Sequence, residues 1–339
     1  MPVIAVDAMG GDFAPEEIVK GVAGASLATA IECVLVGDEP RIQAVLDTLS
    51  YDPSHIRIHH AADAVGMQEA PREALRAKRD ASISVGAKLV AEGQADALVS
   101  AGNTGACLLA CAREFRVVKG VRKPALASVY PRHVDHPGQD PLALLLDVGA
   151  TVHCDAADLV QFAVMGNAWA RRASKTARPK VGLLNMGAEP FRGGDVLAAA
   201  HERLAALPAI DFIGNVEGSD VAEGRADVIV CEGLLGSVVL KFIEGIAGVV
   251  NDVASYAVRQ RLLWRLGMRL LSGGLREVAH LTEHAAYGGA PLLGFEQLLV
   301  KVHERSRAPA IANAVKLAAK TVRDGVVAEI AAAVQEVRA

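Results

Sequence analysis

Short runs of apolar residues, separated by helical stretches, constrain the fold of this chain more than any other feature. Val3–Val6, Leu142–Leu146 and Val228–Val230 carry apolar side chains at successive positions, without the polar alternation of a half-exposed strand. Strands of this kind have to be covered on both faces, as they are in parallel sheets flanked by helices. The sequence therefore predicts an α/β fold in which helices cover both faces of a mostly parallel sheet.

The same plan continues along the chain. Further strands are predicted at Glu32–Val36, Ile56–His59, Ala97–Val99, Val181–Leu184 and Phe212–Asn215. Helices are predicted after Pro15, a residue suited to a first helical turn, and over Ser82–Glu92, Thr104–Phe115 and Ala156–Arg171. No internal repeat or low-complexity linker is present, so residues 1–339 are expected to form one unit of two lobes packed around a cleft.

Composition excludes several classes of protein. A hydrophobic content of 52% excludes global disorder, and a net charge of -4 with 4% aromatic residues argues against a nucleic-acid partner. Charged residues or glycines interrupt every apolar stretch before about 18 residues, so no transmembrane helix is predicted. The N-terminal residues enter a strand directly, which predicts no signal peptide and a cytoplasmic location.

The cysteines and histidines do not indicate a metal site. The 5 cysteines are scattered and form no C-x-x-C pair, so we expect reduced thiols. His55, His59 and His60 cluster, but the alternation from His55 to His59 is typical of a strand. No metal or organic cofactor is predicted.

Turns rich in small and polar residues follow several of the predicted strands. They are Met9–Asp12, Gly102–Gly105, Asp147–Gly149, Asn185–Gly187 and Gly214–Asn215. In open α/β sheets ligands bind beyond the carboxyl ends of the strands, where glycine allows backbone N–H groups to approach an anion. Several such turns together predict a site for a phosphate-like anion, with the turns gathered at a common edge.

Motifs for the commoner reaction classes are missing. The sequence has no G-x-x-x-x-G-K-[ST], no G-x-G-x-x-G after the first strand and no G-x-S-x-G. A covalent serine or cysteine mechanism therefore has no support. Direct transfer to a small anion, held by backbone amides and a few cations, is the interpretation that remains.

Six segments, taken together, are similar to one known family. They are Val6–Pro15, Ser100–Ala106, Val160–Gly166, Val181–Gly187, Phe212–Glu217 and Tyr287–Gly294, in order over nearly the whole chain. The chain resembles the bacterial phosphate acyltransferase family (acyl-ACP:phosphate acyltransferase). The resemblance implies conversion of acyl-acyl carrier protein and inorganic phosphate to acyl phosphate, which feeds phospholipid synthesis. It also implies a fold similar to the isocitrate/isopropylmalate dehydrogenase and phosphotransacetylase group, a homodimer and peripheral association with the membrane.

Candidate site residues follow from the turns and from this chemistry, which needs a bound phosphate and a stabilised oxyanion. The expected phosphate-binding residues are Gly10, Gly11, Gly102, Gly105, Lys78, Arg79 and Asn215, and the expected catalytic residues are Asp12, Asn103, Asn185, Lys241 and His303. Each has an ordinary alternative. The asparagines often cap helices, Lys78 and Arg79 fit a solvated helix face, and His303 fits a hydrogen bond to the backbone.

Three positions depart from the family's usual pattern. Thr151 and Ser237 stand where the family usually has asparagine, and Glu304 stands where it usually has glycine. A hydroxyl reaches less far than an amide, and a carboxylate repels phosphate unless it points away or pairs with Arg305. These changes leave activity and substrate preference open.

A basic amphipathic helix is predicted over Tyr256–Ser272, inside a helical segment near residues 245–285. Arg261, Arg265 and Arg269 align at a spacing of four residues. Leu262, Leu263, Trp264, Leu266 and Leu270 lie on the remaining arc and are the expected membrane contacts. A dimer-interface helix is the alternative, and its basic residues also suit the acidic surface of a carrier protein.

Other functions stay open at this point. A short-chain phosphotransacylase acting on acyl-CoA is the nearest enzymatic alternative, and a dehydrogenase of the related fold lacks a nicotinamide fingerprint. A non-catalytic scaffold that binds the membrane or a carrier protein is the alternative from another class.

Overall fold

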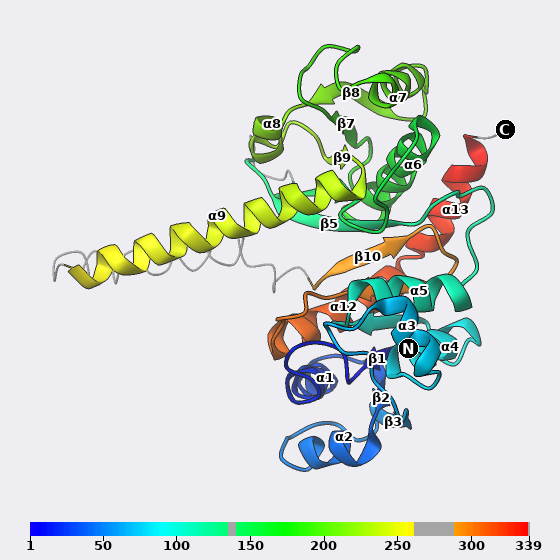
Figure 1. Ribbon diagram of the computed structural model, residues 1–339, viewed down its shortest axis with the longest axis vertical. Coiled ribbons are helices and arrows are strands. Elements are labelled where there is room, and N and C mark those ends of the chain that lie inside the picture. The colour runs from blue at the N-terminus through cyan, green and yellow to red at the C-terminus, as the bar shows by residue number, and fades with distance from the viewer. Residues whose placement is uncertain (135–139, 261–287, 338–339) are drawn as a thin grey trace.

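The computed structural model describes residues 1–134, 140–260 and 288–337 (Figure 1). The strands are β1 (Val3–Asp7), β2 (Glu32–Gly37), β3 (Ile56–His60), β4 (Ala97–Ser100), β5 (Ala125–Pro131), β6 (Leu142–Leu146), β7 (Lys180–Leu184), β8 (Asp211–Val216), β9 (Val228–Val230), β10 (Ala290–Leu293) and β11 (Leu298–Lys301). The helices are α1 (Glu16–Ala28), α2 (Glu39–Leu46), α3 (Pro71–Ala77), α4 (Ser82–Ala91), α5 (Thr104–Glu114), α6 (Ala156–Ala173), α7 (Asp195–Ala205), α8 (Gly218–Glu223), α9 (Gly233–Gln260), α12 (Ala308–Arg323) and α13 (Val326–Glu336). Apart from the helix predicted over Tyr256–Ser272, the strands and helices predicted from sequence are present, with ends shifted by at most two residues.

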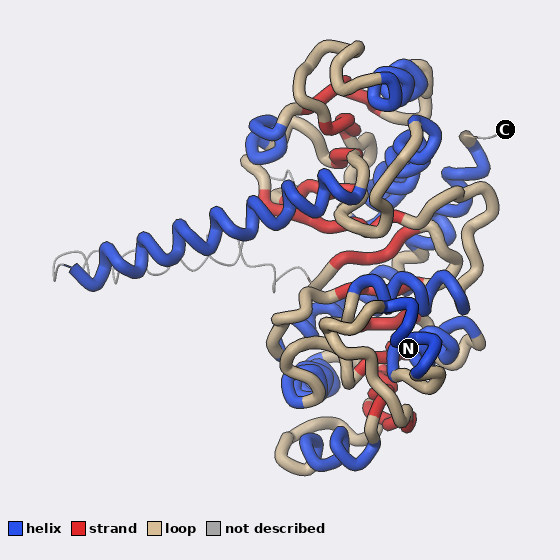
Figure 2. Tube along the Cα trace, viewed as in Figure 1, coloured by secondary structure: helices blue, strands red, loops and turns tan. Residues whose placement is uncertain are grey.

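The strands form one 11-stranded sheet in the order β3-β2-β1-β4-β11-β10-β5-β6-β9-β7-β8, which runs through the molecule between helices (Figure 2). The pairings from β3 to β11 are parallel, as are those from β6 to β8. In the centre, β10 is antiparallel to both neighbours and β5 is antiparallel to β6. The prediction of a mostly parallel sheet is confirmed. The antiparallel centre was not predicted.

Helices cover both faces of the sheet, also as predicted. Alternate residues of each strand enter different cores: Ile4 and Val6 face α1 and α12, whereas Ala5 between them faces α4 and α5. In the other half, Leu144 and Leu146 face α6 and α13. This alternation explains the apolar runs, because both faces of each strand are buried.

The antiparallel centre changes where the strand ends lie. Three successive pairings, β11–β10, β10–β5 and β5–β6, are antiparallel. As a result, the strands β1, β4 and β11 run in the opposite direction to β6, β9 and β7. The loops after β4, β11 and β6 nevertheless meet, since Thr104, His303 and Gly149 line one cavity. The turns at Asn185 and Asn215 do not line it, so the expected gathering of the small-residue turns holds only in part.

Helix α9 extends away from the body of the molecule (Figure 1). Its first turns pack on the core through Val239, Leu240 and Ile243. Another face of the helix leaves a stripe of apolar side chains exposed: Leu235, Val238, Phe242, Ile246, Val249, Val253 and Tyr256. The predicted basic helix lies almost wholly outside the described residues, since α9 is described only to Gln260.

Candidate functional site

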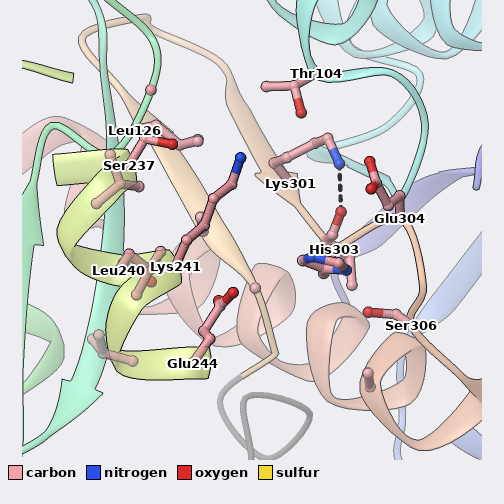
Figure 3. A pocket seen from close by; sticks show the side chains of 18 residues that line it. Thr104, Leu126, Ser237, Leu240, Lys241, Glu244, Lys301, His303, Glu304 and Ser306 are labelled. Carbon is pink, nitrogen blue, oxygen red and sulfur yellow. Dashed lines mark hydrogen bonds between the residues drawn. The ribbon is translucent and has the colours of Figure 1, made fainter. Parts of the chain in front are cut away.

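A cavity of about 330 Å³ lies over β5 and β10, between α5 and α9. It therefore sits on the antiparallel centre of the sheet, where the two parallel groups meet. Its walls are Thr104, Leu126, Ser128, Val129, Val148, Gly149, Ser237, Leu240, Lys241, Glu244, Gly289, Ala290, Lys301, Val302, His303, Glu304, Ser306 and Ala310 (Figure 3). Of the residues predicted from sequence, the cavity brings together Lys241 and His303.

Two lysine side chains enter this cavity from opposite walls, Lys241 from α9 and Lys301 from the end of β11 (Figure 3). Among the described residues, no carboxylate oxygen lies within 4.0 Å of either lysine nitrogen, the distance that defines an ion pair. His303, Glu244 and Glu304 line the same cavity. The cavity therefore holds two lysines and two carboxylates, and an anionic ligand can contact the lysine ammonium groups directly.

Lys301 is the buried member of the pair, with 7% of its surface exposed. It occupies the last position of β11, where β4 and β10 flank it and the first turn of α5 lies beside it. Its Nζ donates to the carbonyl oxygen of Val302. Burial lowers the pKa of Lys301, and the nearby Cys107, Glu304 and Asp7 oppose that change.

The imidazole of His303 is oriented by its own loop. The backbone N–H of Arg305 donates to His303 Nδ1 over 3.2 Å. A neutral imidazole that accepts at Nδ1 carries its proton on Nε2. The alternative of a backbone hydrogen bond is therefore realised, and it leaves His303 with an Nε2–H donor at the cavity wall.

The turns after β1 and β4 meet above a buried carboxylate. Asp7 Oδ1 accepts from Ser82 Oγ over 2.6 Å, and Asp7 Oδ2 accepts from Ser100 Oγ over 2.7 Å. Ser100 Oγ in turn accepts from the N–H of Gly102 over 3.0 Å. A Cβ on Gly10 would lie 2.7 Å from the backbone nitrogen of Gly102, so only glycine allows this approach. The structure thus brings Gly10 and Gly102 together, with the Gly102 amide already bonded within the protein.

Burial raises the pKa of Asp7, and the two serine hydroxyls, the N–H of Met9 and Lys301 act in the opposite direction. The hydrogen bonds of Asp7 join β1, α4 and β4. The network adjoins the cavity, because Ser100 lies beside Lys301 in the sheet. Its polar groups were not predicted, although the sequence places Ser100 at a strand end.

The asparagine of the second turn caps a helix. Asn103 Oδ1 accepts from the N–H of Ala106 in the first turn of α5, and its Nδ2 donates to the carbonyl oxygens of Met67 and Glu69. Beside it, Gly105 packs against Pro71. Asn103 therefore holds the loop before α3 against α5, and Thr104, the next residue, lines the cavity.

The predicted basic pair does not reach this cavity. Lys78 Nζ lies 2.7 Å from Glu69 Oε2 and donates to the carbonyl oxygen of Ala64 over 2.8 Å. Arg79 lines a different hollow, with Lys88 and Arg113. Both side chains follow the alternative interpretation more closely than the phosphate-binding one.

The loop after β11 is fastened to the loop after β1. The N–H of Asp12 donates to the carbonyl oxygen of Glu304 over 2.9 Å, and a Cβ on Gly11 would lie 3.2 Å from the same oxygen. The guanidinium of Arg307 lies 3.5 Å above the ring of Phe13. Asp12 and Gly11 therefore fix the loop that carries His303, and the Asp12 side chain is exposed.

The loop after β6 is built around Asp147, which has no exposed surface. Asp147 Oδ1 accepts from the N–H groups of Leu126, Gly149 and Ala150, and Oδ2 accepts from the N–H and the hydroxyl of Thr151. The Thr151 hydroxyl is therefore directed at Asp147. Its role is to close this loop, which places Val148 and Gly149 at the cavity wall.

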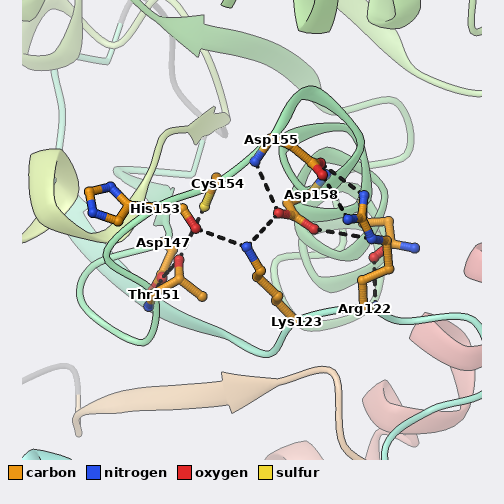
Figure 4. Close-up of polar contacts among 9 residues, drawn as sticks. Arg122, Lys123, Asp147, Thr151, His153, Cys154, Asp155 and Asp158 are labelled. Carbon is orange, nitrogen blue, oxygen red and sulfur yellow. Dashed lines mark hydrogen bonds and ion pairs between the residues drawn. The ribbon is translucent and has the colours of Figure 1, made fainter. Parts of the chain in front are cut away.

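A second carboxylate, that of Asp158, supports the same loop (Figure 4). Asp158, in the first turn of α6, lies 2.8 Å from Lys123 Nζ, which also donates to the carbonyl oxygen of His153 over 2.9 Å. Arg122 bonds Asp155, the N-cap of α6, through both of its terminal nitrogens. These contacts fasten residues 153–158 to the chain that enters β5.

Asn185 follows β7 and Asn215 lies in β8, in the other half of the sheet. Neither side chain lines the cavity or lies at the contact between Gly10 and Gly102. Asn185 Nδ2 donates to the carbonyl oxygen of Arg192 over 3.0 Å, and Asn215 Nδ2 donates to that of Glu189 over 2.8 Å. His201 contacts Asn215 Oδ1. Both amides hold the loop between β7 and α7. They lie apart from the glycine turns because β7 and β8 stand at the opposite end of the strand order from β1 and β4.

Two of the three departures from the family pattern face the cavity, namely Ser237 and Glu304. The charge of Glu304 acts on Lys301. Sequence reasoning missed Lys301 itself. The signal for it was a lysine that ends an apolar strand-like run, Leu298–Val300.

Comparisons with known proteins give one result. A family model described as "Fatty acid synthesis protein" matches residues 3–329. A phosphate acyltransferase of Thermoanaerobacter pseudethanolicus is 40% identical over 328 residues, covering 96% of each chain, and one of Desulfitobacterium hafniense is 42% identical with the same coverage. Among solved structures, a phosphotransacetylase from Streptococcus pyogenes has a TM-score of 0.63 at 17% identity, covering 95% of this chain and 94% of its own, which shows a shared fold.

The resemblance inferred from the six segments is confirmed by these matches, which extend over almost the full length of both partners. The chain belongs to the fatty acid synthesis protein family, and the two relatives named above are phosphate acyltransferases.

Proposed function

We propose that this protein transfers a fatty acyl group from acyl-acyl carrier protein to inorganic phosphate, giving acyl phosphate and free carrier protein for phospholipid synthesis. The observation that carries the proposal is the cavity of about 330 Å³, which presents Lys241 and the Nε2–H of His303 to one space in a chain of this family. The apolar wall formed by Leu126, Val129 and Leu240 gives the first carbons of an acyl chain a surface to contact.

The reaction needs one new bond and one broken bond. An oxygen of hydrogen phosphate attacks the thioester carbonyl carbon, the carbon–sulfur bond breaks, and the proton of the phosphate passes to the departing sulfur. No redox step or covalent enzyme intermediate is required. The protein's contribution is to hold the two reactants together and to stabilise the oxyanion that forms on the carbonyl oxygen.

His303 fits the oxyanion role better than proton transfer. Its Nδ1 lone pair already accepts from Arg305, so a neutral ring offers only the Nε2–H donor. A neutral imidazole that donates to a developing oxyanion is an established catalytic device. Lys241, which is exposed on α9, is placed to neutralise the phosphate or the oxyanion. Asn103 and Asp12 act by holding the loops that carry these groups.

Phosphate-dependent acyl phosphate formation tests the proposal. Acyl-acyl carrier proteins of several chain lengths are incubated with and without phosphate, and both free thiol and acyl hydroxamate are measured, with acetyl-CoA as a parallel substrate. Thiol release that requires phosphate and equals hydroxamate supports the proposal. Turnover of acetyl-CoA alone identifies the short-chain phosphotransacylase, and binding of carrier protein without any product identifies a scaffold.

The exposed stripe of α9 is proposed as the contact with a second copy of the chain. Leu235, Phe242, Val249 and Tyr256 recur at a spacing of seven residues, with Ile246 and Val253 between them. This is the spacing by which helices pack along one another, and the helix stands away from its own body, where nothing in the described residues covers it. A homodimer joined along α9 would bury this stripe.

Peripheral membrane association is proposed from the sequence alone. In residues 1–134, 140–260 and 288–337, no helix combines the length and apolar character needed to cross a bilayer. The expected membrane contacts, Leu262 to Leu270, lie outside the described residues. Vesicle flotation of the whole protein, with Leu266→Glu as the variant, tests this part, and unchanged flotation rejects it.

A further inference from the structure

We infer that Lys301 is the residue that binds the phosphate ion in the cavity, and that Lys78 and Arg79 do not. The inference rests on the proposed function, since it names the group that holds the phosphate of that reaction. It assigns the role to a residue outside the glycine-rich turns from which a phosphate site was expected.

Lys301 is buried, and its charge needs a partner. A lysine that is 7% exposed has lost most of its hydration, and a buried charge without a partner is unfavourable. Its ammonium has three N–H donors, of which the structure assigns one, to the carbonyl oxygen of Val302. Two donors therefore remain on a group that lines the cavity (Figure 3).

The carboxylates near Lys301 act on it only from a distance. Asp7 and Glu304 favour its charged form, but both carboxylate oxygens of Asp7 are bonded to serine hydroxyls. Burial raises the pKa of the Cys107 thiol to about 11, so the thiol is neutral near pH 7. Within the described ranges no carboxylate, Glu304 included, lies within the 4.0 Å of an ion pair with Lys301 Nζ. An anion in the cavity would complete this environment.

The other cations are less suited to the role. Lys78 already pairs with Glu69, and Arg79 lies in another hollow. Lys241 faces the cavity but is exposed, and an exposed charge attracts an anion less strongly than a desolvated one. Lys301 therefore provides the strongest attraction for a small, doubly charged oxyanion.

Direct titration of the whole protein with inorganic phosphate tests the inference without any need for activity. Calorimetry is carried out on the wild type, on Lys301→Met and on Lys88→Met, an exposed lysine of α4 that serves as the matched control. We expect Lys301→Met to weaken phosphate binding by about 30-fold, or about 2 kcal/mol, and Lys88→Met to change it less than about twofold. Binding by Lys301→Met within about twofold of the wild type overturns the inference.

A pH series provides a readout that a merely structural role would not move. The groups that face Lys301 from the surrounding elements are Asp7 of β1, Cys107 of α5, His303 and Glu304 after β11, and Lys241 and Glu244 of α9. Phosphate stays a dianion above about pH 8, and the lowered pKa of Lys301 means that its ammonium loses its proton before the pH reaches the usual lysine value of about 10.4. Phosphate binding by the wild type should weaken between these two pH values, and Lys301→Arg, which stays charged, should bind with little dependence on pH.

This second variant also covers the case in which Lys301→Met does not fold. Flat phosphate affinity of the wild type over that pH range overturns the inference, as does identical pH dependence in Lys301→Arg. Failure of the proposed function has a different signature, because phosphate binding that depends on Lys301 without acyl phosphate formation upholds the inference and rejects the acyl transfer.

Discussion

Replacement of Asp147 by alanine should destabilise the protein more than any other single change in the loop beside the cavity. The side chain is fully buried and accepts five hydrogen bonds, from Leu126, Gly149, Ala150 and twice from Thr151. Its loss leaves the buried N–H of Leu126 without a partner, which costs about 1–3 kcal/mol. The N–H groups of residues 149–151 become partly hydrated, so each contributes less.

The sum for Asp147→Ala is a loss of about 4 kcal/mol in the free energy of unfolding. Thr151→Val is the matched control, because it removes only the hydroxyl bond at nearly constant volume and should cost about 1 kcal/mol. Urea unfolding followed by circular dichroism measures both values, provided that the slope with urea is unchanged. A loss below about 1 kcal/mol for Asp147→Ala, or equal losses for the two variants, would refute this account of the loop.

Three further predictions concern the cavity, α5 and α9. Glu304→Gln should lower the KM for phosphate by about fivefold, or about 1 kcal/mol, because the substitution removes a negative charge from the cavity wall. The control Glu296→Gln, at an exposed position, should leave the KM unchanged. Asn103→Ala should reduce the free energy of unfolding by about 1–2 kcal/mol, measured in urea, and Asn103→Asp, which can still cap α5, should lose less; equal losses would contradict the capping role. Phe242→Glu should convert dimers to monomers in sedimentation velocity, with Leu27→Glu on α1 as an equally exposed apolar control, and a dimer that survives the change excludes the α9 stripe as its interface.

Sequence predicted the flanks of the sheet better than its centre. Runs such as Leu142–Leu146 are apolar at every position because both of their faces are buried, and that pattern is visible without coordinates. The strand Ala125–Pro131 contains serine, tyrosine and proline, and its partner Ala290–Leu293 is distant in sequence. Long-range antiparallel pairing of this kind leaves little local signal.

The candidate site was predicted only where the residue type alone indicates its chemistry. Lys241 was chosen as a cation and His303 as a group for proton transfer, and both line the cavity. Asn185 was chosen for its glycine-rich turn, yet its amide is used to hold the following loop. Its strand, β7, lies near the opposite end of the strand order from β4, which precedes Gly102. Lys301 was hidden by its apolar run, since burial of a lysine depends on elements far apart in the sequence.

Isotope transfer from phosphate tests the central claim, that phosphate and not water accepts the acyl group. The protein is given acyl-acyl carrier protein and phosphate labelled with ¹⁸O at every oxygen, and the product is analysed by mass spectrometry. The account predicts acyl phosphate that retains all four labelled oxygens, with one thiol released per molecule formed. Release of thiol with unlabelled fatty acid as the product, its new oxygen drawn from water, would contradict it.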